Sequence, residues 1–250
     1  MIPGAVSAFT MNQSSDHRVI LVASCGQSAP LRVTINERAR RILLRIDSKK
    51  REAVAVVPSK RHRKRALAFA EERVDWIVKC LAALPDPAGM APGEYTLFRG
   101  IEHRIEKATS GRSVRVEMRE DSPAILIPGR DDLLASKLKG FLRAEARSEL
   151  TARVAVHAAT LGVKPAGITI KDTRSRWGSC SSAGNLNFSW RLICAPPHVL
   201  DYVAAHEVAH LVEMNHSPRF WAQVEKCYGE HKGARKWLND NGRALHAVGG

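Results

Sequence analysis

An eleven-residue stretch near the C-terminus constrains this chain more than any other. It holds three of the ten histidines, His206, His210 and His216, and an acid, Glu207, directly follows the first of them. Apolar residues before and between these histidines recur at helical spacing, which predicts a helix that begins near Pro197. On such a helix His206 and His210 project from one face, one turn apart. Two imidazoles so placed are suited to hold a metal ion.

The same stretch contains the parts of a catalytic zinc site. Two imidazoles one turn apart can occupy two of the four tetrahedral positions around zinc. Glu207 projects about 100° further round the helix. Its carboxylate can therefore approach a metal-bound water without binding the metal, which is the position that a general base needs. We predict that His206 and His210 bind Zn²⁺ and that Glu207 is the catalytic base.

A catalytic zinc needs a third protein ligand, and His216 is the candidate. Asn215 tolerates the left-handed conformation that ends helices, so the chain can turn there and bring His216 back to the metal. Ser217 and Pro218 then read as the N-cap and first residue of a new helix. These residues predict a third ligand fixed between two helices.

Four further motifs precede the histidines: RWGSCSS at 176–182, GNLNF at 184–188, WRL at 190–192 and APP at 195–197. Together with residues 206–221 they resemble the YgjP-like branch of the SprT/WLM zinc metallopeptidases. The resemblance is close over 168–221 and looser over most of the chain. It implies an α+β, zincin-like fold with the HExxH helix beside a small antiparallel sheet. It also implies Zn²⁺ bound by His206, His210 and His216, with Glu207 as base.

The resemblance further implies that a strand beside the metal helix pairs with an extended peptide substrate. Residues 186–189 are predicted to be that strand, with Leu186 and Phe188 on one face and Asn187 on the other. No proline interrupts residues 184–190, so the run can pair through its main chain. We expect Leu186, Asn187 and Phe188 to contact substrate.

The first third of the chain is β-rich and basic. Its runs of β-branched residues predict antiparallel strands, and a helix with an apolar stripe follows them. The helix opens with six basic residues, Lys-Arg-His-Arg-Lys-Arg at 60–65, in a chain of formal net charge +14. These cations form either a solvated face or a surface that binds nucleic acid or another polyanion. The expected strands are 19–23, 31–35, 42–46 and 53–57, and the expected helix is 60–84.

A second set of strands follows a linker rich in proline and glycine, and we see no internal repeat of fixed period. A long helix then starts at Asp131 and ends near Leu161, before Gly162. We expect three parts: a disordered extension at 1–15, a basic sheet-and-helix region at 16–90 and a zincin-like catalytic region at 91–250. The other expected elements are strands 95–98, 101–106, 114–118, 124–127 and 168–171, a polar loop at 173–184 and a C-terminal helix at 232–246.

The five cysteines form no C-x-x-C pair, which is typical of reduced thiols in a cytoplasmic protein. Cys180 and Cys194 are expected to be buried thiols rather than ligands. No apolar run reaches the length of a membrane span, and no signal peptide is evident, so no membrane partner is expected. Met11 is an alternative start of translation.

The favoured function is a zinc metallopeptidase that hydrolyses peptides or unfolded proteins. Two alternatives stay open. The same zinc and base could hydrolyse a phosphoanhydride, as in a nucleotide pyrophosphatase, although the chain has no phosphate-binding glycine loop. A non-catalytic nucleic-acid-binding protein with structural zinc would need a fourth ligand, and no further Cys or His stands at suitable spacing.

Overall fold

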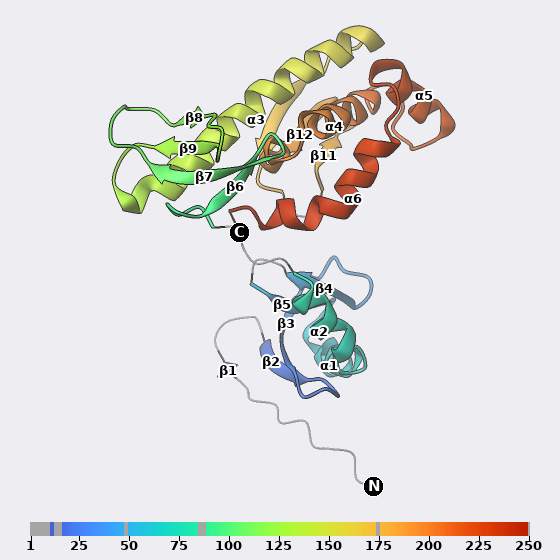
Figure 1. The fold of residues 1–250 in the computed structure, drawn as a ribbon. Coiled ribbons are helices and arrows are strands. Elements are labelled where there is room, and N and C mark those ends of the chain that lie inside the picture. Colours follow the sequence, from blue (N-terminus) through green and yellow to red (C-terminus); the bar gives the residue numbers. More distant parts are fainter. Residues whose placement is uncertain (1–10, 13–16, 48–49, 85–88, 174–175, 250) are drawn as a thin grey trace. The chain divides into compact units, whose positions relative to one another are not determined.

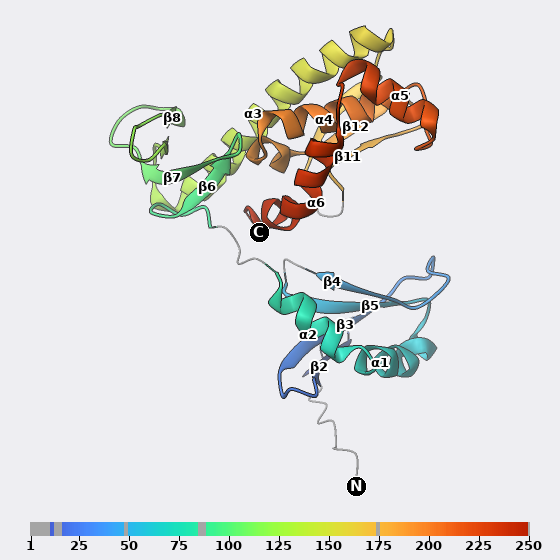
Figure 2. The same cartoon turned by 45° about the vertical axis from the view of Figure 1, so that its right-hand side comes forward.

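The computed structural model describes residues 11–12, 17–47, 50–84, 89–173 and 176–249. The chain divides into two compact units, Met1–Asp86 (unit 1) and Pro87–Gly250 (unit 2), each with its own hydrophobic core (Figures 1 and 2). The α+β fold class is confirmed. Of the expected extension at 1–15, Met11–Asn12 pairs with the next strand, and the rest lies outside the described residues. Within the predicted linker at 85–93, residues 85–88 also lie outside them. No helix in the described ranges is both long and apolar enough to cross a bilayer.

Unit 1 is a five-stranded sheet, in the order β1-β2-β3-β5-β4, packed against two helices. The expectation of purely antiparallel strands is wrong for one pair, because β3 and β5 run parallel, from Leu31↔Ala53 to Ile35↔Val57. Apolar alternation predicts strands but not their order, and here β5 enters between β3 and β4. The elements are β1 (Met11–Asn12), β2 (His17–Val22), β3 (Ser28–Ile35), β4 (Leu43–Asp47), β5 (Glu52–Val57), a 3₁₀ turn η1 (Lys60–His62), α1 (Arg63–Glu71) and α2 (Val74–Ala82).

The single helix expected at 60–84 is also wrong, since η1, α1 and α2 share that stretch. The amide of Arg73 donates to the carbonyl of Ala70 at 3.1 Å, a tightened i→i−3 bond that closes the last turn of α1. The predicted apolar stripe nonetheless faces the core. Ala70 and Ile77 are fully buried, and its other members, Leu67, Val74, Val78 and Leu81, are partly buried and pack against the same core.

Unit 2 opens with a four-stranded sheet that repeats the topology of unit 1. Its order β6-β7-β9-β8 has the same antiparallel, parallel, antiparallel pairings as β2-β3-β5-β4. The shift along the sequence differs from strand to strand because the loops differ in length, so no fixed period is visible. The strands are β6 (Tyr95–Phe98), β7 (Ile101–Lys107), β8 (Arg115–Glu117) and β9 (Ala124–Ile127).

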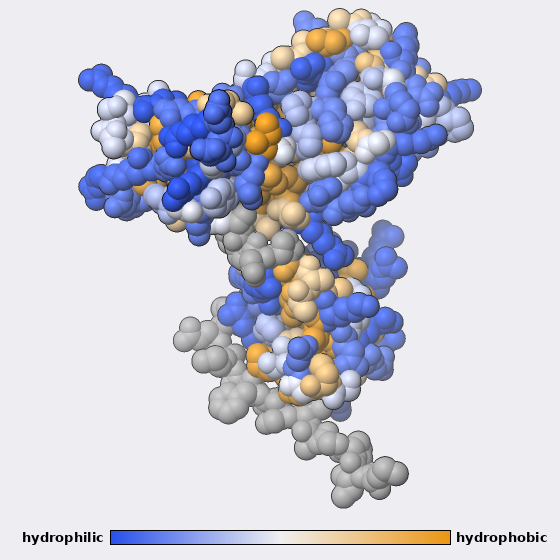
Figure 3. Space-filling view, in the orientation of Figure 1, coloured by the Kyte–Doolittle hydropathy of each residue, from blue (hydrophilic) through white to orange (hydrophobic). Residues whose placement is uncertain are grey.

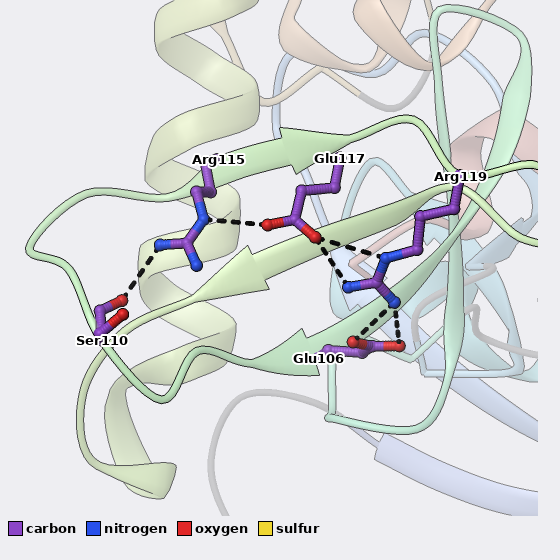
Figure 4. A network of polar contacts seen from close by, with 5 residues as sticks. All are labelled: Glu106, Ser110, Arg115, Glu117 and Arg119. Atoms are coloured by element: carbon purple, nitrogen blue, oxygen red, sulfur yellow. Dashed lines mark hydrogen bonds and ion pairs between the residues drawn. The ribbon is translucent and has the colours of Figure 1, made fainter.

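Surface charges on this sheet pair with one another. Arg119 binds Glu106 at 3.1 Å and Glu117 at 2.9 Å, and Arg115 binds Glu117 at 3.2 Å and the carbonyl of Ser110 at 3.1 Å (Figure 4). Hydrogen bonds from Arg119 and Arg115 lower the pKa of Glu117 despite its exposure. Exposed pairs of this kind add little stability. They belong to a surface that is largely polar, because Figure 3 shows mostly hydrophilic residues on the visible face of unit 2.

The long helix α3 (Asp131–Leu161) connects this sheet to the second half of unit 2. Gly162 ends it in the predicted left-handed conformation, with φ 68°. Its buried residues recur every fourth position, and each such step turns the stripe by about 40° round the helix. The helix runs from beside β9 to the C-terminal helices (Figure 1), and the stripe therefore contacts different elements along its length. The stripe is Leu134, Leu138, Leu142, Ala146, Leu150, Val154 and Ala158.

The rest of unit 2 is a three-stranded sheet and three helices. The sheet is mixed rather than purely antiparallel, because β10 and β12 are parallel. Its third strand, β11, lies inside the stretch expected to be a polar loop at 173–184, and that expectation is wrong. The elements are β10 (Gly167–Lys171), β11 (Gly178–Cys180), β12 (Asn185–Ser189), a 3₁₀ turn η2 (Trp190–Cys194), α4 (Pro197–Ala209), α5 (Pro218–Cys227) and α6 (Lys232–Ala247).

The strand predicted at 186–189 is present as β12. It has no free edge at which a peptide substrate could pair. β12 is the middle strand, paired with β10 on one side and β11 on the other. Leu186 and Phe188 lie in the core, 0% and 1% exposed. The pattern predicted the strand correctly, but the partner in β11 consists of Gly178, Ser179 and Cys180, residue types that propensity does not favour in strands.

A buried histidine joins α3 to α4 and to the end of α5. His157 of α3 is 3% exposed. Its Nε2 lies 2.7 Å from Asp201 Oδ1 on α4, and its Nδ1 lies 3.1 Å from the carbonyl oxygen of Cys227 at the end of α5. Both partners are acceptors, so both bonds form only when the ring is doubly protonated. Burial opposes that charge, but the hydrogen bonds to Asp201 and Cys227 outweigh it and raise the pKa of His157 to about 9.

This contact predicts that the protein loses stability as the pH rises. The folded pKa of His157 lies above the usual value near 6.5. The contribution is therefore complete below about pH 6.5 and is lost as the pH rises through about 9, at a cost of about 2–3 kcal/mol. Urea unfolding at pH 6, 7.5 and 9 should show this loss in the wild type and a smaller one in His157→Gln. Equal pH dependence in both proteins would contradict it.

Candidate metal centre and active site

The three histidines come from the end of α4 and the loop after it. His206 lies in the last turn of α4, His210 caps that helix, and His216 precedes α5. The next helix starts as predicted, because Ser217 Oγ accepts from the amide of Phe220 at 3.4 Å and Pro218 is the first helical residue. These caps fix the chain on both sides of the loop.

The left-handed turn expected at Asn215 is absent. Among the described residues other than glycine, only Arg51 and Arg99 have positive φ. The chain instead leaves α4 through tight right-handed turns, in which the amides of Val212 and Glu213 both donate to the carbonyl of Ala209 at 3.0 Å. The loop thus reaches the metal site without the strained conformation that we expected.

The imidazoles converge closely enough to bind one ion. One ring nitrogen from each of His206, His210 and His216 lies within 4.8 Å of the others, and the Nε2 atoms of His206 and His216 are 3.1 Å apart. Tetrahedral zinc with Zn–N bonds of about 2.0–2.1 Å requires nitrogens about 3.3 Å apart. His210 Nδ1 lies 3.1 Å from the carbonyl oxygen of Glu213, which leaves Nε2 for a metal. The donor set therefore fits zinc.

The protonation states also suit a metal site. Burial, and then the charges of His210 and His216, lower the pKa of His206 to about 3. Burial likewise lowers the pKa of His210. Imidazoles bind metal in the neutral form, so these rings are ready to bind at neutral pH.

Glu207 is the buried acid of the site. It is 5% exposed, and its Oε2 is buried with no hydrogen-bond partner in the described part of the chain. In the metal-free site burial raises its pKa to about 8, and the charge of Arg176 opposes that rise. A bound metal cation would favour the ionised carboxylate. A Cβ on Gly178 of β11 would clash with the Glu207 side chain, so a larger residue at this position would displace the carboxylate. One carboxylate oxygen thus remains available for a bound water.

A pocket of about 260 Å³ opens beside His206 and Glu207. The C-terminal helix α6 supplies one wall of this pocket. Sequence reasoning did not identify Arg235 and Asn239 as site residues, although their i, i+4 spacing on α6 was an available signal. The lining residues are Trp177, Gly178, Tyr202, Val203, His206, Glu207, Arg235, Leu238 and Asn239.

Other sequence candidates fall outside the histidine group. Asn187 Nδ2 donates to Ser179 Oγ at 3.4 Å rather than facing the pocket's lining. Cys194 is buried and Cys180 half-buried, and neither belongs to the metal-binding group found among the described residues. His231 also lies outside this group, and it stacks on Trp221 at 4.7 Å.

The fold and this constellation define a metallopeptidase domain of the zincin-like kind. The sequence profile of the family described as "YgjP-like, metallopeptidase domain" matches residues 40–241, most of the chain. The chain belongs to the YgjP-like metallopeptidases, which confirms the resemblance found in its motifs.

Two further comparisons add little. The zymogen of the Pyrococcus abyssi metallopeptidase abylysin is similar at 20% identity, over 36% of this chain and 90% of that one, with a TM-score of 0.33. A similarity this weak carries no weight in the assignment. No curated protein matches the chain.

Proposed function

We propose that this protein is a zinc-dependent peptidase in which His206, His210 and His216 bind the metal and Glu207 is the general base. Family membership supports metal-dependent peptide hydrolysis. The observation that carries the finer assignment is the convergence of three imidazoles within 4.8 Å beside a buried carboxylate with an unpartnered oxygen.

Each residue then has one role. Zinc, when bound, lowers the pKa of its water to near 7 and polarises the scissile carbonyl. Glu207 accepts the proton of the attacking water and passes it to the leaving amine. Its burial keeps it from solvent, and Gly178 leaves room for its carboxylate. Tyr202 lines the pocket and is a candidate donor to the oxyanion.

The edge for an extended substrate is β11 rather than β12. The amides of Ser189 and Ser181 bond to the carbonyls of Trp177 and Asn185, which sets the alternation of the β11–β12 ladder. The main-chain groups of Gly178 and Cys180 therefore point away from β12. A peptide that pairs with them would run beside Glu207.

Removing the metal tests this function. Dialysis against a zinc chelator should abolish cleavage of an unfolded protein such as casein, and one equivalent of Zn²⁺ should restore it. The same amount of Mg²⁺ should not, because imidazoles are poor ligands for it. Undiminished cleavage by the metal-free protein would refute the proposal.

The basic surface of unit 1 supports a second role, in binding a polyanion. β3 and β5 are parallel, so the segments after both strands lie at one end of the sheet. Residues of both line one hollow of about 420 Å³, among them Glu37 and Lys60. The exposed cations of these segments and of the start of α1 are Arg38, Arg40, Arg41, Lys60, Arg61, Lys64 and Arg65.

The dependence of nucleic-acid affinity on salt tests this second role. Each phosphate contact adds about −0.9 to the slope of log K against log salt for B-DNA. The variant with Gln at Lys60, Arg61, Lys64 and Arg65 should therefore have a clearly flatter slope. A control with Gln at four exposed cations of unit 2, Arg112, Lys164, Lys226 and Arg243, should keep the wild-type slope. If both variants behave alike, these cations are only a solvated face.

A further inference from the structure

The pocket beside Glu207 contains a cation for which the proposed hydrolysis has no use. Arg235 and Asn239 of α6 form one wall, and Trp177 with Gly178 forms another. The residues Tyr202, Val203, His206 and Glu207 of α4 also line it. We call this space the Arg235 pocket. It is adjacent to the base, where a side chain of a bound substrate would lie.

Arg235 is held in place by a stack of rings. Its guanidinium lies 5.1 Å from the centre of the Trp221 ring. Trp221 stacks on His231 at 4.7 Å and 11°, and His231 stacks on Tyr202 at 6.1 Å and 10°. His231 and Tyr202 are buried, so the stack has a rigid base. A cation fixed in this way loses less side-chain entropy when it binds a ligand.

The guanidinium is also without an acidic partner. None of the ion pairs among the described residues involves Arg235, whereas the adjacent Lys236 pairs with Asp240. Its N–H donors thus remain for a ligand, in the fork geometry that matches a carboxylate. Asn239, one turn further along the same face of α6, adds an amide that can donate to the same group.

The size of the pocket favours one side chain over a larger ligand. Small-molecule sites typically measure about 300–1,000 Å³, and this pocket measures about 260 Å³. Glu207 is the one acid among the lining residues. It serves as the catalytic base, and the positive charge of a bound metal would balance its negative charge. A cationic substrate side chain would meet Arg235 at close range, with Arg176 also near Glu207. The charge balance selects an anion.

We propose that the Arg235 pocket is a specificity subsite for a carboxylate of the peptide, supplied by an Asp or Glu side chain or by a free C-terminus next to the cleaved bond. Arg235 is the specificity-determining residue and binds the carboxylate through two N–H donors. Asn239 donates a further hydrogen bond. This inference rests on the proposed peptidase function and names the substrates of that site.

Peptide libraries test it directly. Each position near the cleaved bond is varied among Glu, Gln and Lys, and a second set compares free with amidated C-termini. The wild type should prefer Glu over Gln at one position, or the free C-terminus over the amide, by about 10–100-fold in kcat/KM, as charge-assisted hydrogen bonds imply. Arg235→Gln should lose this preference, and Arg235→Glu should shift it towards Lys. Lys236→Gln, the neighbouring control, should keep the wild-type profile.

Binding provides a readout separate from turnover. In the Glu207→Gln background, calorimetry with the preferred peptide should show affinity that falls about 10-fold or more when Arg235→Gln is added, with zinc content and circular dichroism unchanged. If Arg235→Gln keeps the wild-type preference and affinity, the subsite is refuted, although Glu207-dependent cleavage still supports the peptidase. If the wild type cleaves none of the peptides, the function and the subsite fail together.

Discussion

Glu207→Gln is expected to retain the metal and the fold and to lose about 10²–10⁴-fold of the hydrolytic rate. The amide has nearly the size of the carboxylate, which matters because β11 passes so close to it that Gly178 has no room for a Cβ. It cannot take a proton from water. The buried Oε2, which has no partner among the described residues, marks the atom whose basicity is lost.

The measurement is kcat/KM on one unfolded protein, with zinc content determined for each sample. Glu225→Gln is the matched control, because it makes the same change at an exposed position on α5. It should leave turnover unchanged. Near-normal turnover in Glu207→Gln with full zinc would remove Glu207 from the base role.

The second large effect is loss of the metal. Alanine at His206, His210 or His216 should each lower bound zinc from about one equivalent to nearly none after dialysis, because two imidazoles cannot complete a catalytic site. His216→Ala is the cleanest test. That residue is exposed, so its truncation leaves no cavity in the core.

His198→Ala is the control for this experiment. His198 is exposed, lies on α4 as His206 does, and is absent from the histidine group. The variant should keep its zinc, as measured by elemental analysis, and its melting temperature. Full zinc in His216→Ala would exclude that residue as a ligand and would point to another donor.

Sequence patterns correctly predicted those elements that are determined by residues close together in the chain. The long helix α3, its end at Gly162 and the Ser217 cap all follow from spacing and backbone chemistry, and all appear in the structure. The break between α1 and α2 was missed because neither glycine nor proline marks it. A single tightened hydrogen bond at Arg73 closes α1 there.

Long-range pairing was the part that sequence could not predict. β11 is a strand because Gly178 to Cys180 pair with Leu186 to Phe188 of β12. The residue types in β11 do not predict this pairing. The same limit hid the repeated topology of the two sheets, whose loops differ in length. It also hid the Arg235 pocket, because Arg235 meets His206 only after α6 folds back against α4.

One parallel assay tests the central claim most directly. Zinc-loaded wild type and Glu207→Gln are each incubated with an unfolded protein and with nucleoside triphosphates, and new peptide termini and released pyrophosphate are measured. The peptidase account predicts peptide cleavage that depends on Glu207 and no pyrophosphate release that does. Glu207-dependent pyrophosphate release, with no Glu207-dependent cleavage across a broad peptide library, would contradict it.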